Sequence, residues 1–442
     1  MSIPENSNSM AENKKILHIG MSLAATWLDE KDSVAFSAKA NDTYPIESDI
    51  ELCRMSETAK LDFMFLPDTL FANPRGLRGG QGPGPGSLDP TLKLAALSQH
   101  SSHVGLLTTV STTFFPPYIV ARQLQTLHWL SGGRAGWNIV TALDGHRNFG
   151  FDDMPSPDEK YARAAEFTEV VRRLWASNPA PGTEGYDQSL IQPIEHEGSY
   201  FKVAGPLNVR APNSDRIPLI QAGASETGRE FAAQVADAIF ASTPDKDAAI
   251  SLRADLRKRA VAHGREADDI VIMPGLNCYL AETRAEAQDL FMETNASIDR
   301  GRRLDMVKKM IGIDLTDWPD DRPIRAADLP ALPGTLRSRT HSELLRRMIQ
   351  RDEPTVSELL QRPESAGSGH WRIIGTVDDA AEQIAEWHRD GAIDGFINVP
   401  GGGVDSMKRT LHDLIPQLAQ RGLFRKDYKS KSFLGHLRER WL

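Results

Sequence analysis

The sequence is short of cysteine, of long apolar runs and of net positive charge. Its 442 residues include two cysteines, Cys53 and Cys278, too few and too far apart for a disulfide scaffold or a CxxC metal or redox site. No apolar run approaches the roughly 20 residues of a membrane span, and the beginning, MSIPENSNSMAENKK, lacks the apolar segment of a signal peptide. The formal net charge of -9 argues against nucleic acid or an anionic membrane as a partner. These absences favour a cytoplasmic protein without membrane contact.

The sequence also lacks the common motifs of several enzyme classes. In 74–90, PRGLRGGQGPGPGSLDP, prolines alternate with glycines, and proline has no N–H with which to bind a pyrophosphate. A nicotinamide-binding fingerprint is therefore excluded, and the loop is either the mobile rim of an active site or a plain surface loop. The twelve histidines form no HExxH or HxH motif, so we predict no metal site. A GxSxG nucleophile motif is missing as well.

Eight short apolar runs alternate with stretches of helical periodicity. The runs do not alternate with polar residues, as expected for parallel strands that are covered on both faces. Eight such strand and helix units predict an α/β protein, and a (β/α)8 TIM barrel rather than an open doubly wound sheet. The expected strands are 15–21, 62–66, 103–109, 137–141, 217–223, 237–242, 269–281 and 394–400.

We expect a single barrel domain over residues 1–442 with three insertions. The insertions lie near 74–90, 178–215 and 285–372. The second contains HEGSYFKVAGPLNV, which is typical of a short strand pair. The third is long and helix-rich, and it is interrupted by Pro- and Gly-rich breaks.

Polar side chains follow several of the expected strands, at the end where TIM-barrel enzymes place their active sites. Asp68 follows the second strand, Thr109 ends the third, and Asn138 lies in the fourth. Each alone is equally typical of a turn, but together they favour a site for a polar ligand.

The segment GASETGRE follows the fifth expected strand and begins a helix. Ala224 and Ser225 would lie at the helix N-terminus, where free N–H groups and the helix dipole favour a phosphate. Ser225 would also serve as an ordinary N-cap, which stabilises a helix by about 1 kcal/mol. The two roles are compatible, and these residues alone do not separate them.

The segment LTTVSTTFFPPYIVARQLQTLHWLSGGRAGWNIVTALDGHRNFG (107–150) resembles the bacterial-luciferase-like flavin monooxygenases. Within that superfamily it is most similar to the branch of nitrilotriacetate monooxygenase component A and dibenzothiophene sulfone monooxygenase. FMFLPDTLF, KYARAAEFTEVVRRLW, IPLIQAGASETGREFAA and RGLFRKDY support the resemblance, which extends from residue 45 to residue 428.

The resemblance implies a TIM-barrel enzyme that binds reduced FMN supplied by a separate NAD(P)H:flavin reductase. Such an enzyme oxygenates a small molecule, often a xenobiotic compound, with O2 through a flavin (hydro)peroxide. Family members assemble as homodimers or homotetramers. Carried over by motif, Asp68, Thr109, Ala142 and Leu143 would contact the flavin ring system, and Tyr161, Ala224 and Ser225 would bind its phosphate.

Two departures from the family's pattern bear on the site. GMSLAATWLDEKD stands where family members have a His-rich segment with Ala-Trp-Arg, and Thr141-Ala142 replaces Thr-Ser. The first part of this segment, GMSLAATW, offers Met21, Leu23 and Trp27 and contains no basic residue, so we expect an apolar or aromatic substrate. The candidate proton-handling residues are His18, Asn138 and His146.

Two other functions remain open. One is a deazaflavin (F420)-dependent dehydrogenase on the same fold, and the other is a metal-dependent barrel hydrolase. The basic tail, KDYKSKSFLGHLRERWL, either packs on a neighbouring subunit through Leu434 and Trp441 or frays.

Overall fold

The computed structural model describes most of the chain. The described residues are 15–23, 46–71, 88–142, 144–182, 185, 187–213, 215–223, 225–296, 300–332, 339–366 and 369–440.

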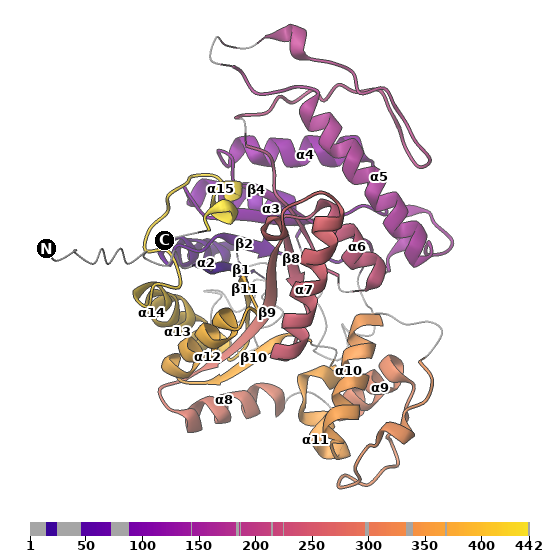
Figure 1. Ribbon diagram of the computed structural model, residues 1–442, viewed down its shortest axis with the longest axis vertical. Coiled ribbons are helices and arrows are strands. Elements are labelled where there is room, and N and C mark those ends of the chain that lie inside the picture. Colours follow the sequence, from indigo (N-terminus) through magenta and orange to yellow (C-terminus); the bar gives the residue numbers. More distant parts are fainter. Residues whose placement is uncertain are drawn as a thin grey trace, which may run out of the picture.

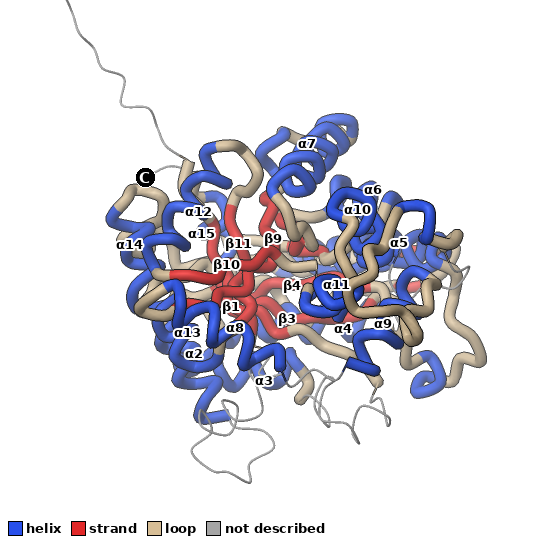
Figure 2. Tube along the Cα trace, turned by 90° about the horizontal axis from the view of Figure 1, so that it is seen from below, coloured by secondary structure: helices blue, strands red, loops and turns tan. Residues whose placement is uncertain are grey.

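Eight parallel strands form a closed barrel in which neighbours follow the order of the chain and the last strand pairs with the first. Figure 2 shows these strands at the centre of the molecule, surrounded by helices. Each strand overlaps one of the eight expected apolar runs, so the prediction of a (β/α)8 barrel is confirmed. The strands are β1 (His18–Ser22), β2 (Phe63–Leu66), β3 (Gly105–Ser111), β4 (Ala135–Val140), β7 (Leu219–Gln221), β8 (Ala238–Ala241), β9 (Val271–Leu280) and β11 (Gly395–Pro400).

The surrounding helices begin where the sequence supplies caps. Ser156 Oγ accepts a hydrogen bond from the Glu159 N–H ahead of α5, and Thr376 forms a reciprocal capping box with Asp379 at α12. The barrel helices are α2 (Ile46–Thr58), α3 (Pro90–Leu97), α4 (Pro117–Leu130), α5 (Pro157–Ala176), α6 (Glu226–Val235), α7 (Lys246–Ala262), α12 (Val377–Arg389), α13 (Gly403–Arg409) and α14 (Ile415–Gln420).

Short helical turns complete these connections. A π-helical turn, Thr410–Leu414, joins α13 to α14. The 3-10 turns are η3 (Ser98–His100), η4 (His146–Phe149), η5 (Gln188–Leu190), η6 (Ala267–Asp269), η7 (Ala326–Asp328) and η8 (Pro363–Ala366).

The barrel interior is filled by side chains from alternate strand positions. Phe63 and Leu107 are among the buried residues of this inner cluster. Gly20 faces Phe63, and a Cβ on Gly20 would overlap the phenyl ring, so a residue without a side chain is needed there. The intervening strand residues, such as Ile19 and Leu106, pack outward against the helices.

The carboxyl-terminal tail closes the amino end of the barrel. It forms α15 (Phe433–Arg438), and the Phe433 ring lies where Cβ atoms on Gly105 and Gly136 would be. Leu434 is buried in the same chain, which corrects the expectation that it packs on a neighbour or frays. The other expected anchor, Trp441, lies outside the described residues.

One further strand was not predicted. β10 (Trp371–Gly375) pairs in parallel with the carboxyl half of β9, from Leu276 to Leu280. Its residues are alternately buried and partly exposed, so it lacks the continuous apolar run by which the other strands were found. The expected strand pair is confirmed as β5 (His196–Glu197) and β6 (Lys202–Val203).

A group of helices between β9 and β10 has its own small core, which includes Val307, Leu345 and Leu359. This group lies at the carboxyl end of the barrel, because Leu344 of α10 approaches Gly369 beside Ser242, directly after β8. Figure 1 shows these helices in the lower part of the molecule and α15 in its upper part. The helices of this group are α9 (Arg300–Ile311), α10 (Arg339–Asp352) and α11 (Val356–Gln361). The preceding helix, α8 (Arg284–Ala296), packs against β9 and β10 instead.

No helix among the described residues is both long enough and apolar enough to span a membrane.

Candidate active site

The carboxyl ends of all eight strands meet at one mouth of the barrel, where β3 and β4 place a buried polar pair. Thr109 and Asn138 are register partners, and Asn138 Nδ2 donates a hydrogen bond to Thr109 Oγ1 over 3.0 Å. Both side chains are less than 5% exposed. The Asn138 Oδ1 atom has no hydrogen-bond partner in the described part of the chain. Two predicted site residues are therefore brought together, and the Asn138 Oδ1 atom is available to accept a hydrogen bond from a ligand.

Other buried polar atoms near the strand carboxyl ends share this property. More than nine in ten buried polar groups in proteins have a partner, so a cluster of exceptions indicates a polar ligand. Among the described residues, the atoms without a hydrogen-bond partner include Gln221 Oε1, Ser242 Oγ, Thr243 Oγ1 and Asn277 Oδ1.

The start of α6 and the first turn of α5 approach each other beside this mouth. Ser225 caps α6, and its Oγ accepts a hydrogen bond from the Gly228 N–H over 3.2 Å. A Cβ on Gly228 would lie 2.7 Å from the Tyr161 hydroxyl oxygen and 3.0 Å from Ser225 Oγ. A Cβ on Gly223 would lie 3.1 Å from the same hydroxyl. Tyr161 and Ser225 thus border one cradle, while Ala224 lies outside the described residues.

Ala142 follows β4 and is held by both of its backbone groups. Its N–H donates to Thr113 Oγ1 over 3.1 Å, and its carbonyl accepts from Lys160 Nζ over 3.1 Å. Burial lowers the pKa of Lys160. Sequence reasoning did not single out Lys160, because a lysine beside Tyr161 in a helix resembles any solvated lysine. Leu143 lies outside the described residues.

Asp68 and His146 lie in neighbouring loops at the same end. Asp68 follows β2 and is partly buried, and His146 begins η4 after β4. Asn148 Nδ2 donates to the Leu70 carbonyl over 3.0 Å, which joins the two loops. His146 Nδ1 lies 3.5 Å from Asp144 Oδ1.

His18 lies at the opposite end of the barrel. It is the first residue of β1, and its Nδ1 is 3.1 Å from Asp62 Oδ1 in the buried cluster with Arg425. Burial raises the pKa of Asp62, but Arg425 and His18 outweigh it and lower the pKa to about 2. His18 therefore belongs to the ion pairs beneath the tail helix and lies away from the mouth. The expected strand began three residues too early, which moved His18 toward its middle.

Aromatic rings line the interior just below the mouth, and sequence reasoning missed them. The His370 ring stacks on Phe240 with centroids 5.3 Å apart, and Phe240 meets Phe65 edge-on at 5.4 Å. Burial, with a smaller contribution from His341, lowers the pKa of His370 to about 4, so the ring is neutral at pH 7. No motif marks His370, since its neighbours on the barrel come from distant strands.

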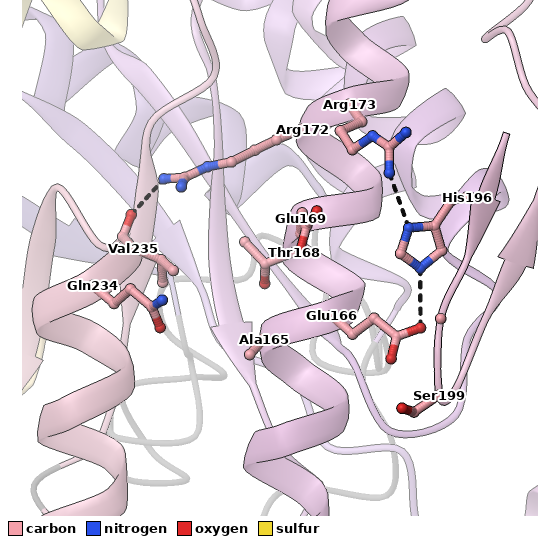
Figure 3. A pocket seen from close by; sticks show the side chains of 11 residues that line it. Ala165, Glu166, Thr168, Glu169, Arg172, Arg173, His196, Ser199, Gln234 and Val235 are labelled. Atoms are coloured by element: carbon pink, nitrogen blue, oxygen red, sulfur yellow. Dashed lines mark hydrogen bonds and ion pairs between the residues drawn. The ribbon is translucent and has the colours of Figure 1, made fainter. Parts of the chain in front are cut away.

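A cleft of about 560 Å³ lies elsewhere, on the outside of the barrel (Figure 3). Glu166 accepts hydrogen bonds from the Tyr200 and Phe201 N–H groups and lies 3.0 Å from His196 Nε2. These contacts attach the β5–β6 strand pair to α5 (Figure 3). The cleft is lined by α5 from Ala165 to Arg173, by the end of α6 and by the β5–β6 strand pair, and its lining includes neither Tyr161 nor Ser225.

No group of three or more His, Cys, Asp or Glu side chains that could hold a metal ion occurs among the described residues.

Comparison with known proteins places this geometry in one family. The family model of luciferase-like monooxygenases matches residues 33–393. Nitrilotriacetate monooxygenase component A from Aminobacter aminovorans is 33% identical over 421 residues, which are 91% of each chain. N-acetyl-S-(2-succino)cysteine monooxygenase from Bacillus subtilis (strain 168) is 32% identical over 443 residues, which are 97% of each chain.

Solved structures agree with the sequence comparison. The EDTA monooxygenase from Chelativorans sp. BNC1 superposes with a TM-score of 0.79 at 28% identity, covering 96% of this chain and 98% of that chain. The barrel fold and the similarity to these relatives assign the protein to a family. The chain belongs to the luciferase-like monooxygenase family and is a flavin-dependent monooxygenase.

Proposed function

We propose that this protein is the oxygenase component of a two-component system that uses reduced FMN and O2 to oxygenate a small organic substrate. The observation that carries the cofactor assignment is the cradle formed by Ser225, Gly228 and Tyr161, beside buried polar atoms that have no hydrogen-bond partner within the described residues. A helix N-terminus with a glycine at close approach suits a phosphate, and the acceptors suit the N–H groups of a flavin. These residues fit FMN.

In this proposal Tyr161, Ser225 and Ala224 bind the phosphate, and Lys160 adds a positive charge beside Ala142. Asp68, Thr109, Ala142 and Leu143 surround the ring system. Asn138 has an amide that does not titrate, so its role is to accept a hydrogen bond through Oδ1. His146 stays as the candidate that holds or moves a proton.

Bound reduced flavin supplies the reaction with O2 and the transfer of one oxygen atom to the substrate. The protein's own contribution is to orient both partners and to exclude water. The rings of Phe65 and Phe240 form an apolar wall below the mouth, and α10 covers the carboxyl end. Removing water strengthens each hydrogen bond to the cofactor.

We propose a separate NAD(P)H:flavin reductase as the source of reduced FMN. One relative is named component A of nitrilotriacetate monooxygenase, which denotes one part of a larger system. We also propose a homodimer or homotetramer, as the resemblance implies.

The substrate is proposed to have an apolar or aromatic body, in keeping with Phe65 and Phe240. Met21 and Leu23, two of the residues on which that expectation rested, belong to the cluster that packs outward against the helices. Trp27, the third residue on which that expectation rested, lies outside the described residues. Relatives are named for compounds as different as nitrilotriacetate and dibenzothiophene sulfone, so membership of the family alone does not select one.

The test supplies the protein with FMN, NADH and a flavin reductase and follows isotopically labelled O2. We expect a panel of small organic compounds to yield a product carrying one labelled oxygen atom, only when protein and reductase are both present. Product formed with reduced F420 and without O2 would instead support the dehydrogenase alternative, whose solved examples share the fold alone at 12–14% identity.

A further inference from the structure

The interior face of β9 leads to a tyrosine at the mouth. Val271 and Met273 belong to the inner cluster of the barrel. Because strand side chains alternate, Asn277 and Tyr279 lie on that same face, farther toward the carboxyl end. The Tyr279 ring meets Phe291 of α8 edge-on, with centroids 5.0 Å apart.

β10 presents an arginine on the same side. Trp371 and Ile373 face α12, and Trp371 stacks on Trp387 with centroids 3.9 Å apart. His370 and Arg372 therefore share the other face, and His370 is already seen to pack on Phe240 inside the barrel. The Arg372 guanidinium lies 4.7 Å from the Phe291 centroid, so it approaches the ring that Tyr279 also contacts.

The charge of Arg372 is poorly balanced by its neighbours. Its Nη1 is buried with no hydrogen-bond partner in the described part of the chain, and the same holds for Glu364 Oε2. Burial lowers the pKa of Arg372. Glu364 and Tyr279 raise it only in part, and Arg362 lowers it further. A partly buried guanidinium whose Nη1 has no acceptor calls for an anionic one.

A second arginine reinforces the positive charge. Arg303 of α9 is 5% exposed, and its Nη1 donates to the Leu360 carbonyl. Burial lowers the pKa of Arg303, and Tyr279 is the ionisable group that opposes this. Both guanidinium groups therefore lie within electrostatic reach of the same hydroxyl.

We propose that Arg372, supported by Arg303 and the Tyr279 hydroxyl, forms a subsite for a carboxylate group of the substrate at the mouth of the barrel. Guanidinium groups recognise carboxylates through paired, charge-assisted hydrogen bonds. The proposal rests on the proposed function and deepens it, since the substrate then has an apolar body and a carboxylate. The two arginines come from β10 and α9. The expectation of an apolar substrate rested on a different segment, GMSLAATW, which contains no basic residue.

The test measures binding by calorimetry to the full-length protein loaded with FMN. The probes are carboxylates of graded apolar size, succinate, benzoate and 4-phenylbutanoate, each beside its uncharged primary amide. We expect at least one carboxylate to bind at least 10-fold more tightly than its amide. Arg372→Gln and Arg372→Met should abolish that preference, and Arg372→Lys should retain part of it.

The matched control is Arg421→Gln, which removes an arginine paired with Glu382 on the outer helices and should leave carboxylate binding unchanged. No preference for any carboxylate in the wild-type protein would overturn the subsite, as would a preference that survives in Arg372→Gln and Arg372→Met. FMN binding is recorded in the same samples. Its absence from the wild-type protein would reject the proposed function, whereas its presence without carboxylate preference would reject the subsite alone.

Discussion

At the scale of single residues, the proposed function gives the Ser225 hydroxyl two roles, one in helix capping and one in binding. Its Oγ accepts a hydrogen bond from the Gly228 N–H and so begins α6. The other amides of that first turn have no partner inside the helix, as at every helix N-terminus, and Tyr161 lies close by. In the proposed function, these amides and the Ser225 hydroxyl bind the phosphate, so the cap and the phosphate site are compatible.

Replacing Ser225 tests this double role. Ser225→Ala should weaken FMN affinity about 10-fold, since a hydrogen bond to a charged group contributes about 1.5 kcal/mol. Calorimetry with FMN measures the change. The matched control is Ser432→Ala, which removes the N-cap of α15, where Ser432 Oγ accepts from the Gly435 N–H. It should lower stability by about 1 kcal/mol and leave FMN affinity intact. Wild-type affinity in Ser225→Ala would rule out the phosphate role.

His370 makes stability depend on pH. Its folded-state pKa of about 4 is below the ordinary value of 6.5, so the unfolded chain binds the proton more readily. Its contribution to stability is fully present above pH 6.5 and is lost as the pH falls toward 4, with a slope of at most about 1.4 kcal/mol per pH unit. Urea unfolding at several pH values should show a shallower acid loss for His370→Gln than for wild type. Identical slopes in both would contradict the buried neutral ring.

At the scale of elements, the amino end of the barrel depends on a helix from the far end of the chain. α15 inserts Phe433 against Phe63, with ring centroids 5.0 Å apart. Gly105 and Gly136 leave the space for that ring. Arg425 reaches Asp62 from the same tail over 2.8 Å. The tail is thus part of the barrel core. It fills the amino end of the barrel, which lies opposite the mouth.

Truncating the ring tests this packing. Phe433→Ala should destabilise the protein by about 3–5 kcal/mol, because it removes a fully buried phenyl group and leaves a cavity. The urea midpoint measures the loss. Phe151→Ala removes an exposed ring and should cost less than about 1 kcal/mol. A Phe433→Ala midpoint equal to that of Phe151→Ala would show that the tail is dispensable for the core.

At the scale of the whole molecule, the barrel was predictable because each strand carries its own continuous apolar run. The helices were predictable for a similar local reason, because stretches of helical periodicity separate the apolar runs. β10 was not, because its pattern alternates and its pairing with β9 is a tertiary contact. Local sequence patterns thus suffice to predict the eight strand and helix units, but they do not predict β10.

The site was predictable only in part, for a related reason. Ser225 and Tyr161 occur in recognisable segments, and the structure brings them together. Arg372, Arg303 and Tyr279 come from β10, α9 and β9, and no local spacing links them. Their meeting depends on how the helices between β9 and β10 fold over the mouth, so it appears only in three dimensions.

Anaerobic titration of the purified protein with reduced FMN tests whether the mouth of the barrel binds this cofactor. We expect saturation at one reduced FMN per chain and weaker binding by Ser225→Ala. Reduced F420, offered in the same way, should bind less tightly. Absence of saturable binding of reduced FMN, or tighter binding of reduced F420, would contradict the account.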